Sequence, residues 1–301
     1  MTEPAPSPVL PAFDVERLRV SAELRLSSSM EAFTEFAGLR EALAPASPEA
    51  LRPRLMAQAV RLSEAMAPDT WSLAHAARGA LRLERPMEIY LSSDRESAAV
   101  HAIEEPVVLE IPGRLLPLLD RGATVAAFGH ELGHYLAHGP WIPHGNACLV
   151  ADLVARHAGA SSALASTAGA LSLAMELTAD RFTLLASQEL TSLLRLEITA
   201  ATSLPGDALT WHAEAWLLHG RELMEALLAG RDPDAAGAGP EQAVRSWAAW
   251  LFSETAEYRA LTGRGPGSRS LAEVDALLDR ALSLSSLRFE RRLLDAPPPE
   301  L

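Results

Sequence analysis

The spacing of apolar positions divides the chain into two helical regions with a short β-rich segment between them. Residues 14–85 carry apolar side chains at helical intervals, and we expect two to four helices there. The pattern after residue 187 is helical again. Between these regions, short stretches rich in Val, Ile and Tyr predict strands at 87–91, 98–103 and 106–111. The chain is therefore predicted to be mainly α with a small β-sheet, in the α+β class.

These patterns also suggest segment boundaries. Residues 1–13 contain four prolines and no apolar periodicity, which predicts a disordered tail. Residues 14–85 are the N-terminal helical region, and residues 86–187 are the expected catalytic core. Residues 188–301 are expected to form a C-terminal helical region packed on that core.

Composition then limits the classes of partner and site. The formal net charge is −13, whereas nucleic-acid binders display a clustered basic face, so we expect no nucleic acid as partner. The single Cys148 can form neither an intramolecular disulfide nor a cysteine metal cage. Any metal must therefore be held by His and carboxylate side chains.

Two further stretches bear on location. The opening residues MTEPAPSPVLPAF lack the basic start and apolar run of a secretion signal, which favours a cytoplasmic protein. Residues 158–175 carry no charge and approach the length of a membrane span. Their Ala, Gly, Ser and Thr content favours a packed helix over membrane insertion. A membrane-bound enzyme with 158–175 inserted is the alternative.

The most informative segment contains His130, Glu131 and His134 in an HExxH arrangement, on a predicted helix that begins after Asp120. Four helical residues turn the chain through about 400°, so both imidazoles project from one face about 6 Å apart. That separation suits two ligands of one Zn²⁺. Glu131 lies one step around the helix, where it can act as general base on water at the open position. The motif predicts one catalytic zinc per chain.

The third ligand must come from elsewhere in the chain. His138 is eight residues beyond His130, about 12 Å along a continuous helix, which is too far to share a metal with ligand bonds near 2 Å. The other candidates that carry no accompanying motif are His144, Asp152 and His157. His144 and His157 stand alone, and an isolated His is usually a surface residue or a satisfied core residue.

Glu176 and Asp180 differ because they are four residues apart and share one helix face. A His₂Glu zinc site needs one carboxylate on the metal and commonly a second one that accepts the outer N–H of a ligand His. In isolation such a pair is usually a solvated pair of helical acids. Beside HExxH, we interpret Glu176 as the third ligand and Asp180 as the supporting carboxylate.

The stretches GHELGHYLAHG and ELTADRF together resemble the motifs of gluzincin zinc metallopeptidases of the HtpX and CAAX prenyl protease type. In that family HExxH is followed, on a later helix, by ExxAD. The matching positions are His130, Glu131, His134, Glu176, Ala179 and Asp180. The resemblance covers roughly residues 86–187 and implies a zincin-like core with added N- and C-terminal helices. It also implies that Asp180 supports His130.

This chain departs from the family pattern in two respects. The best-known members are integral membrane proteins, whereas this chain has no convincing span, so the resemblance is to a soluble branch and implies no prenylated substrate. Many members also carry a His-Pro followed by an Arg near the end of the domain. The comparable stretch FSETAEYRAL has Tyr258 and Arg259 but no His-Pro, so the usual substrate-orienting element is altered or lost.

The sequence thus predicts a zinc-dependent endopeptidase that acts on a peptide or protein substrate. Substrate is expected to bind as an extended strand along the sheet edge within 98–111. A donor must also stabilise the oxyanion, and the candidates by chemistry alone are His212, His219, Tyr258 and Arg259. The alternative function is a catalytically silent zinc-binding helical interaction protein. The intact Glu131 argues against it, because a structural zinc site needs no base beside an open position.

Overall fold

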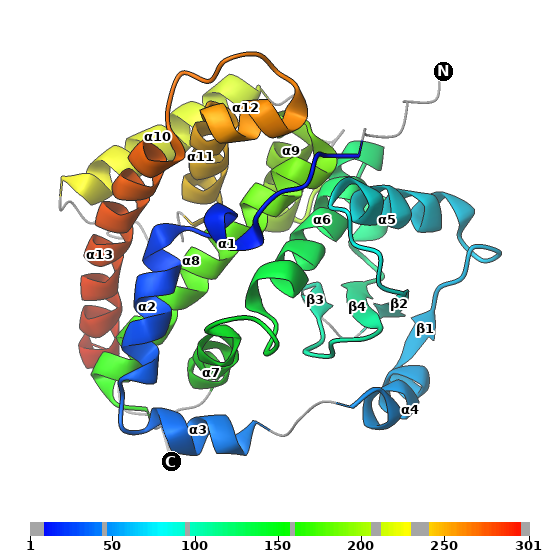
Figure 1. Ribbon diagram of the computed structural model, residues 1–301, viewed down its shortest axis with the longest axis horizontal. Helices are drawn as coiled ribbons and strands as arrows, with labels where there is room; N and C mark the ends of the chain where they lie inside the picture. The colour runs from blue at the N-terminus through cyan, green and yellow to red at the C-terminus, as the bar shows by residue number, and fades with distance from the viewer. Residues whose placement is uncertain are drawn as a thin grey trace.

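A computed structural model describes residues 9–43, 47–93, 97–156, 160–205, 212–229 and 241–295. It confirms the predicted class, because helices dominate and a small four-stranded mixed sheet lies beside them (Figure 1). Two large clusters of buried apolar side chains hold these elements together.

The N-terminal region has more elements than the apolar spacing indicated. Its helices are α1 (Val15–Leu18), α2 (Ser21–Glu31), α3 (Phe36–Ala42), α4 (Pro48–Gln58) and α5 (Pro68–Ala80). The expectation of two to four helices was wrong because α1 and α3, with four and seven residues, are too short for a helical repeat to show. A strand, β1 (Ala59–Arg61), was also missed. It has three residues and its Val60 is 53% exposed, so no alternating pattern marks it.

The sheet contains the three predicted strands and β1. They are β2 (Met87–Ser92), β3 (Ala99–Val100) and β4 (Val107–Pro112), in the order β1-β2-β4-β3. β2 and β4 are parallel, whereas β3 runs antiparallel to β4. β2 and β4 are almost fully buried, which explains why most of their residues are apolar. Because β3 is an edge strand and β4 an inner one, only the first part of 98–111 offers a sheet edge.

Three helices carry the central part of the chain: α6 (Arg121–His138), α7 (Gly145–Arg156) and α8 (Ser162–Ser187). The side chain of Asp120 caps α6 by accepting the N–H of Ala123 at 2.8 Å. α6 and α8 pack unusually closely through glycine, since a Cβ on Gly133 would lie 2.8 Å from Cβ of Phe182. This packing brings HExxH on α6 next to the ELTAD segment on α8 (Figure 1).

The uncharged stretch 158–175 lies mostly in α8, where Leu164, Ala168 and Leu171 are buried in the second core cluster. Among the helices that the structure describes, none combines the length and apolar content needed to cross a bilayer. Residues 157–159 lie outside the described residues.

The C-terminal region is helical, as expected. Its helices are α9 (Leu190–Thr202), α10 (Ala213–Leu228), α11 (Glu241–Ser253), α12 (Ala256–Thr262) and α13 (Leu271–Asp295). α11 contacts both α8 and α9, and α13 packs against α8. The C-terminal helices α11 and α13 therefore cover part of α8, which packs against α6.

The predicted disordered tail is wrong for residues 9–13, while residues 1–8 lie outside the described part of the chain. Leu10 is only 2% exposed within the first core cluster, and its carbonyl accepts a hydrogen bond from Arg82 at 3.1 Å. The ring of Phe13 lies 6.2 Å from that of Phe182. Prolines exclude regular helix here, but an extended apolar segment can still be buried.

Candidate metal centre

The first two candidate ligands come from consecutive turns of α6. His130 and His134 project from the same face, and their Nε2 atoms lie 3.2 Å apart. Both side chains are mostly buried, with exposed fractions of 13% and 16%. The two imidazoles therefore share one face of a continuous, capped helix as predicted, but their ring centroids are 4.7 Å apart rather than about 6 Å.

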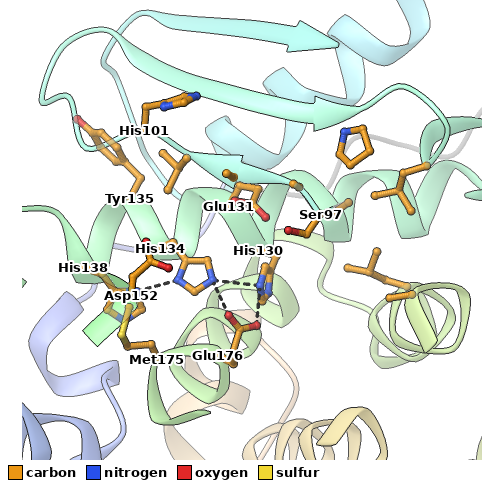
Figure 2. A pocket seen from close by; sticks show the side chains of 18 of the residues that line it. Ser97, His101, His130, Glu131, His134, Tyr135, His138, Asp152, Met175 and Glu176 are labelled. Carbon is orange, nitrogen blue, oxygen red and sulfur yellow. Dashed lines mark hydrogen bonds and ion pairs between the residues drawn. The ribbon is translucent and has the colours of Figure 1, made fainter. Parts of the chain in front are cut away.

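Glu176 approaches the two imidazoles from α8 (Figure 2). Its nearest oxygens lie 3.3 Å from Nε2 of His130 and 3.4 Å from Nε2 of His134. One ligand atom from each of the three side chains lies within 4.8 Å of the other two, so the three residues could hold one metal ion.

Asp180 holds the outer nitrogen of His130. Its Oδ1 lies 3.2 Å from Nδ1 of His130, and its two oxygens accept hydrogen bonds from Nε and Nη2 of Arg245, both at 2.8 Å. Nη1 of the same guanidinium lies 2.9 Å from Oε2 of Glu176. Arg245, which lies on α11, therefore contacts both carboxylates and holds them in position.

The charges around these side chains favour a cation. Burial tends to raise the pKa of Glu176, but the charge of Arg245 and the hydrogen bonds from the imidazoles outweigh burial and hold that pKa well below its usual value. Burial would lower the pKa of His130, yet its contacts with Asp180 and Glu176 hold it well above the usual value. Two ionised carboxylates face one guanidinium, so the centre has an excess negative charge that a proton or a metal ion can offset.

A third carboxyl lies behind the centre. Oε1 of Glu197, on α9, is 3.0 Å from Nη2 of Arg245. Burial raises the pKa of Glu197 to about 8, against the opposing charge of Arg245. Glu197 is therefore harder to ionise than Glu176 and Asp180. No motif in the sequence marked Arg245 or Glu197, because both reach the centre from helices distant along the chain.

The centre opens into a groove of about 1330 Å³. Glu131 lines this groove and is 5% exposed, on the side of α6 that faces the sheet (Figure 2). The edge strand β3 and the residues beside it, 98–102, form the opposite wall. A general base and a sheet edge thus flank the candidate ligands.

The register of β3 shows which backbone groups face this groove. The N–H of His101 donates to the carbonyl of Val108 at 2.9 Å, so His101 and, two residues before it, Ala99 direct their backbone groups toward β4. The N–H and C=O of Val100 consequently point to the outer edge. Val100 lines the groove, where an extended peptide could pair with it.

The structure does not bring the sequence-based oxyanion candidates to the groove. His212 and His219 are exposed at or within α10, Tyr258 is 1% exposed against Phe252, and Arg259 bonds Glu254 at 2.7 Å. Donor chemistry alone could not locate them, because placement depends on helix packing. The strong donors that line the groove, among the described residues, include Arg54, His101, Arg114, Tyr135, Trp141 and Arg245.

The remaining candidates for the third ligand are also placed. Nδ1 of His138 lies 2.9 Å from Nδ1 of His134, so His138 contacts a candidate ligand rather than the metal position. His144 is near Glu31, with 3.1 Å between Nδ1 and Oε2. Asp152 lines the groove from α7 and is exposed, and His157 lies outside the described residues.

Comparisons with protein-family models, with curated proteins and with solved structures found no match to this chain. The function is therefore argued from the geometry of the centre.

Proposed function

We propose that this chain is a zinc-dependent endopeptidase. The observation that carries the proposal is the convergence of His130, His134 and Glu176, with one ligand atom of each within 4.8 Å of the others, in a groove that Glu131 also lines. The likeness to gluzincins belongs to the same proposal, since HExxH lies on α6 and ExxAD on the adjoining α8. A zincin-like core is the interpretation of these elements that we favour.

The donor set favours zinc, because two imidazole nitrogens and one carboxylate oxygen are ligands of catalytic zinc and HExxH adds a general base beside them. His₂Glu is also a ligand set of zinc peptidases that leaves one position open.

Zinc, when bound, would supply a Lewis acid that acidifies water and polarises a peptide carbonyl. Glu131 would take the proton from the attacking water and pass it to the leaving amine. Val100 would hold the substrate in an extended conformation across the groove through its outward N–H and C=O. Asp180 and Arg245 would keep His130 and Glu176 in place during turnover.

The test is to measure the zinc content of the purified protein and its cleavage of casein, with and without a chelator. We expect one zinc per chain and loss of cleavage on chelation. Glu131→Gln should retain zinc and lose turnover by about 100-fold or more, because only proton transfer is removed. Cleavage by metal-free protein would overturn the proposal. Zinc-loaded protein that cleaves nothing would favour the silent zinc-binding interaction protein instead.

We also propose a cytoplasmic location for this peptidase. Cys148 is buried and has no second cysteine with which to pair. A chain without disulfides is compatible with a reducing compartment.

A further inference from the structure

The outer nitrogen of His134 is held by a buried chain of side chains that begins in the N-terminal helix α2. We propose that His138 and Glu23 are positioning residues for the metal centre, acting on His134 as Asp180 acts on His130. This inference rests on the proposed function only in taking His134 as a metal ligand. It implies that the N-terminal helical region contributes to metal binding.

The first link is between the two imidazoles. Nδ1 of His134 lies 2.9 Å from Nδ1 of His138, one helical turn further along α6 (Figure 2). A ligand nitrogen must present its lone pair, so if Nε2 of His134 binds metal, Nδ1 carries the hydrogen. Nδ1 of His134 then donates, and Nδ1 of His138 accepts. His138 must therefore carry its own hydrogen on Nε2.

The second link reaches α2. Nε2 of His138 lies 3.3 Å from Oε2 of Glu23, which is within ion-pair distance but lacks hydrogen-bond alignment, so the ring N–H that the first link requires lies beside a carboxylate. With His134 bound to metal through Nε2, this arrangement requires a hydrogen on Nδ1 of His134 and on Nε2 of His138. An anion at the far end increases the basicity of a ligand imidazole and fixes its orientation, as in carboxylate–histidine–zinc sites.

Glu23 is itself held firmly. Its side chain is fully buried, Nε of Arg19 donates to Oε1 at 2.8 Å, and the hydroxyl of Thr178 donates to Oε2. Thr178 stands between Glu176 and Asp180 on α8, so the same short helical segment anchors both supports. Nη1 of Arg19 donates to the carbonyl of Pro143 at 2.9 Å, which ties the chain to the loop after α6.

Burial gives the strongest reason to assign a role to this network. The side chains of His138, Glu23 and Arg19 are 5%, 0% and 0% exposed. Burying an ion pair and a neutral imidazole costs more free energy than an apolar core of the same volume. A purely structural contact at this place would be served better by apolar side chains. Orientation of His134 explains why polar ones are present.

The test compares zinc affinity, by competition with a chromogenic chelator, in wild type, His138→Phe, Glu23→Gln and the double variant. His138→Phe should weaken zinc binding by about 10- to 100-fold, and Glu23→Gln by a smaller factor. Because Glu23 acts through His138, adding Glu23→Gln to His138→Phe should weaken zinc binding no further. The absorption bands of the Co²⁺-substituted protein should shift in both single variants, which a change in stability alone would not cause.

A matched control is His144→Gln, since His144 also faces a glutamate of α2, Glu31, but contacts no candidate ligand. It should bind zinc as wild type does. If wild type binds zinc and the folded Glu23→Gln and His138→Phe proteins bind it equally well, this inference is overturned and the proposed function is untouched. If His138→Phe does not fold, Glu23→Gln decides alone. Wild type that binds no zinc would overturn both.

Discussion

Asp180 Oδ1 lies 3.2 Å from Nδ1 of His130. Nε and Nη2 of Arg245 donate hydrogen bonds to the two oxygens of the same carboxylate, both at 2.8 Å. A carboxylate fixed at two oxygens cannot rotate away from the imidazole. It therefore holds the ring of His130 with Nε2 toward His134 and Glu176. Asp180 of the ExxAD motif therefore positions His130 of the HExxH motif.

Replacing Asp180 by Asn should weaken zinc affinity by about 10- to 100-fold with the helical content preserved, because the imidazole loses its anionic partner. Glu176→Gln should weaken binding more, since it removes a negatively charged ligand. Chelator competition would measure both, with Asp152→Asn as a control in the groove. If both variants bind zinc like wild type, the acid pair on α8 does not belong to a metal site.

Much of this centre could be predicted because it depends on spacing within helices. His130 and His134 are one turn apart on α6, and Glu176 and Asp180 are one turn apart on α8. Helix geometry fixes each pair without knowledge of the fold. Only the meeting of the two pairs required the resemblance to a known family.

The parts that sequence reasoning missed depend on contacts between distant segments. Arg245 is 65 residues from Asp180 and reaches it from α11, where it has no distinctive neighbours. His138 was excluded as a metal ligand on distance, and no role was assigned to it, because nothing in the sequence places Glu23 beside it. Tyr258 was chosen for its donor chemistry and is instead buried against Phe252. Residue type limits the possible chemistry, but packing selects the partners.

The close contact between α6 and α8 predicts a sensitive glycine. A Cβ at Gly133 would lie 2.8 Å from Cβ of Phe182 and 3.1 Å from Cα of Ala179. Gly133→Ala should destabilise the protein by about 1–3 kcal/mol, because the helices must separate. Zinc affinity should fall as well, since Glu176 would move from the imidazoles. Urea unfolding and chelator competition would measure the two effects.

The control for this prediction is Gly79 in α5, where an added Cβ would meet nothing within 4 Å. Gly79→Ala should stabilise the protein by about 0.5–1 kcal/mol, because alanine loses less backbone freedom in a helix than glycine. Equal effects of the two substitutions would show that helix propensity, rather than the α6–α8 contact, controls the result at Gly133.

Glu88 on β2 should make stability depend on pH. Burial tends to raise its pKa, but hydrogen bonds from Arg52 and Tyr90 and the charge of Arg61 outweigh burial, so the pKa lies below the ordinary 4.5. A carboxyl with a lowered folded-state pKa stabilises above its unfolded pKa, and that contribution is lost as the pH falls through the folded-state pKa. Glu88→Gln should therefore cost about 1–2 kcal/mol at pH 7 and progressively less below pH 4.5.

Chemical unfolding of wild type and Glu88→Gln between pH 3 and pH 7, the range we would scan around the carboxyl pKa, would measure this difference. Glu64→Gln is a suitable comparison, because the side chain of Glu64 is exposed. A gap between wild type and Glu88→Gln that stays constant down to the lowest pH would show that Glu88 contributes by packing and not by its charge.

The edge strand β3 gives a prediction about substrate binding that does not depend on metal binding. Because the N–H of His101 pairs with Val108, the N–H of Val100 points away from β4 to the outer edge of the sheet, and Val100 lines the groove. Proline is tolerated on edge strands where the N–H faces outward, so Val100→Pro removes one outward-facing donor and keeps the β3–β4 ladder.

If substrate pairs with β3, Val100→Pro should raise KM for a peptide by roughly 2- to 10-fold, the effect of losing one hydrogen bond worth about 0.5–1.5 kcal/mol. Zinc content should not change, because Val100 is not one of the candidate ligands. Val100→Ala is the matched control, since it shortens the side chain and keeps the N–H, and its KM should stay closer to wild type. Equal KM values for Val100→Pro and Val100→Ala would mean that the peptide takes another path through the groove.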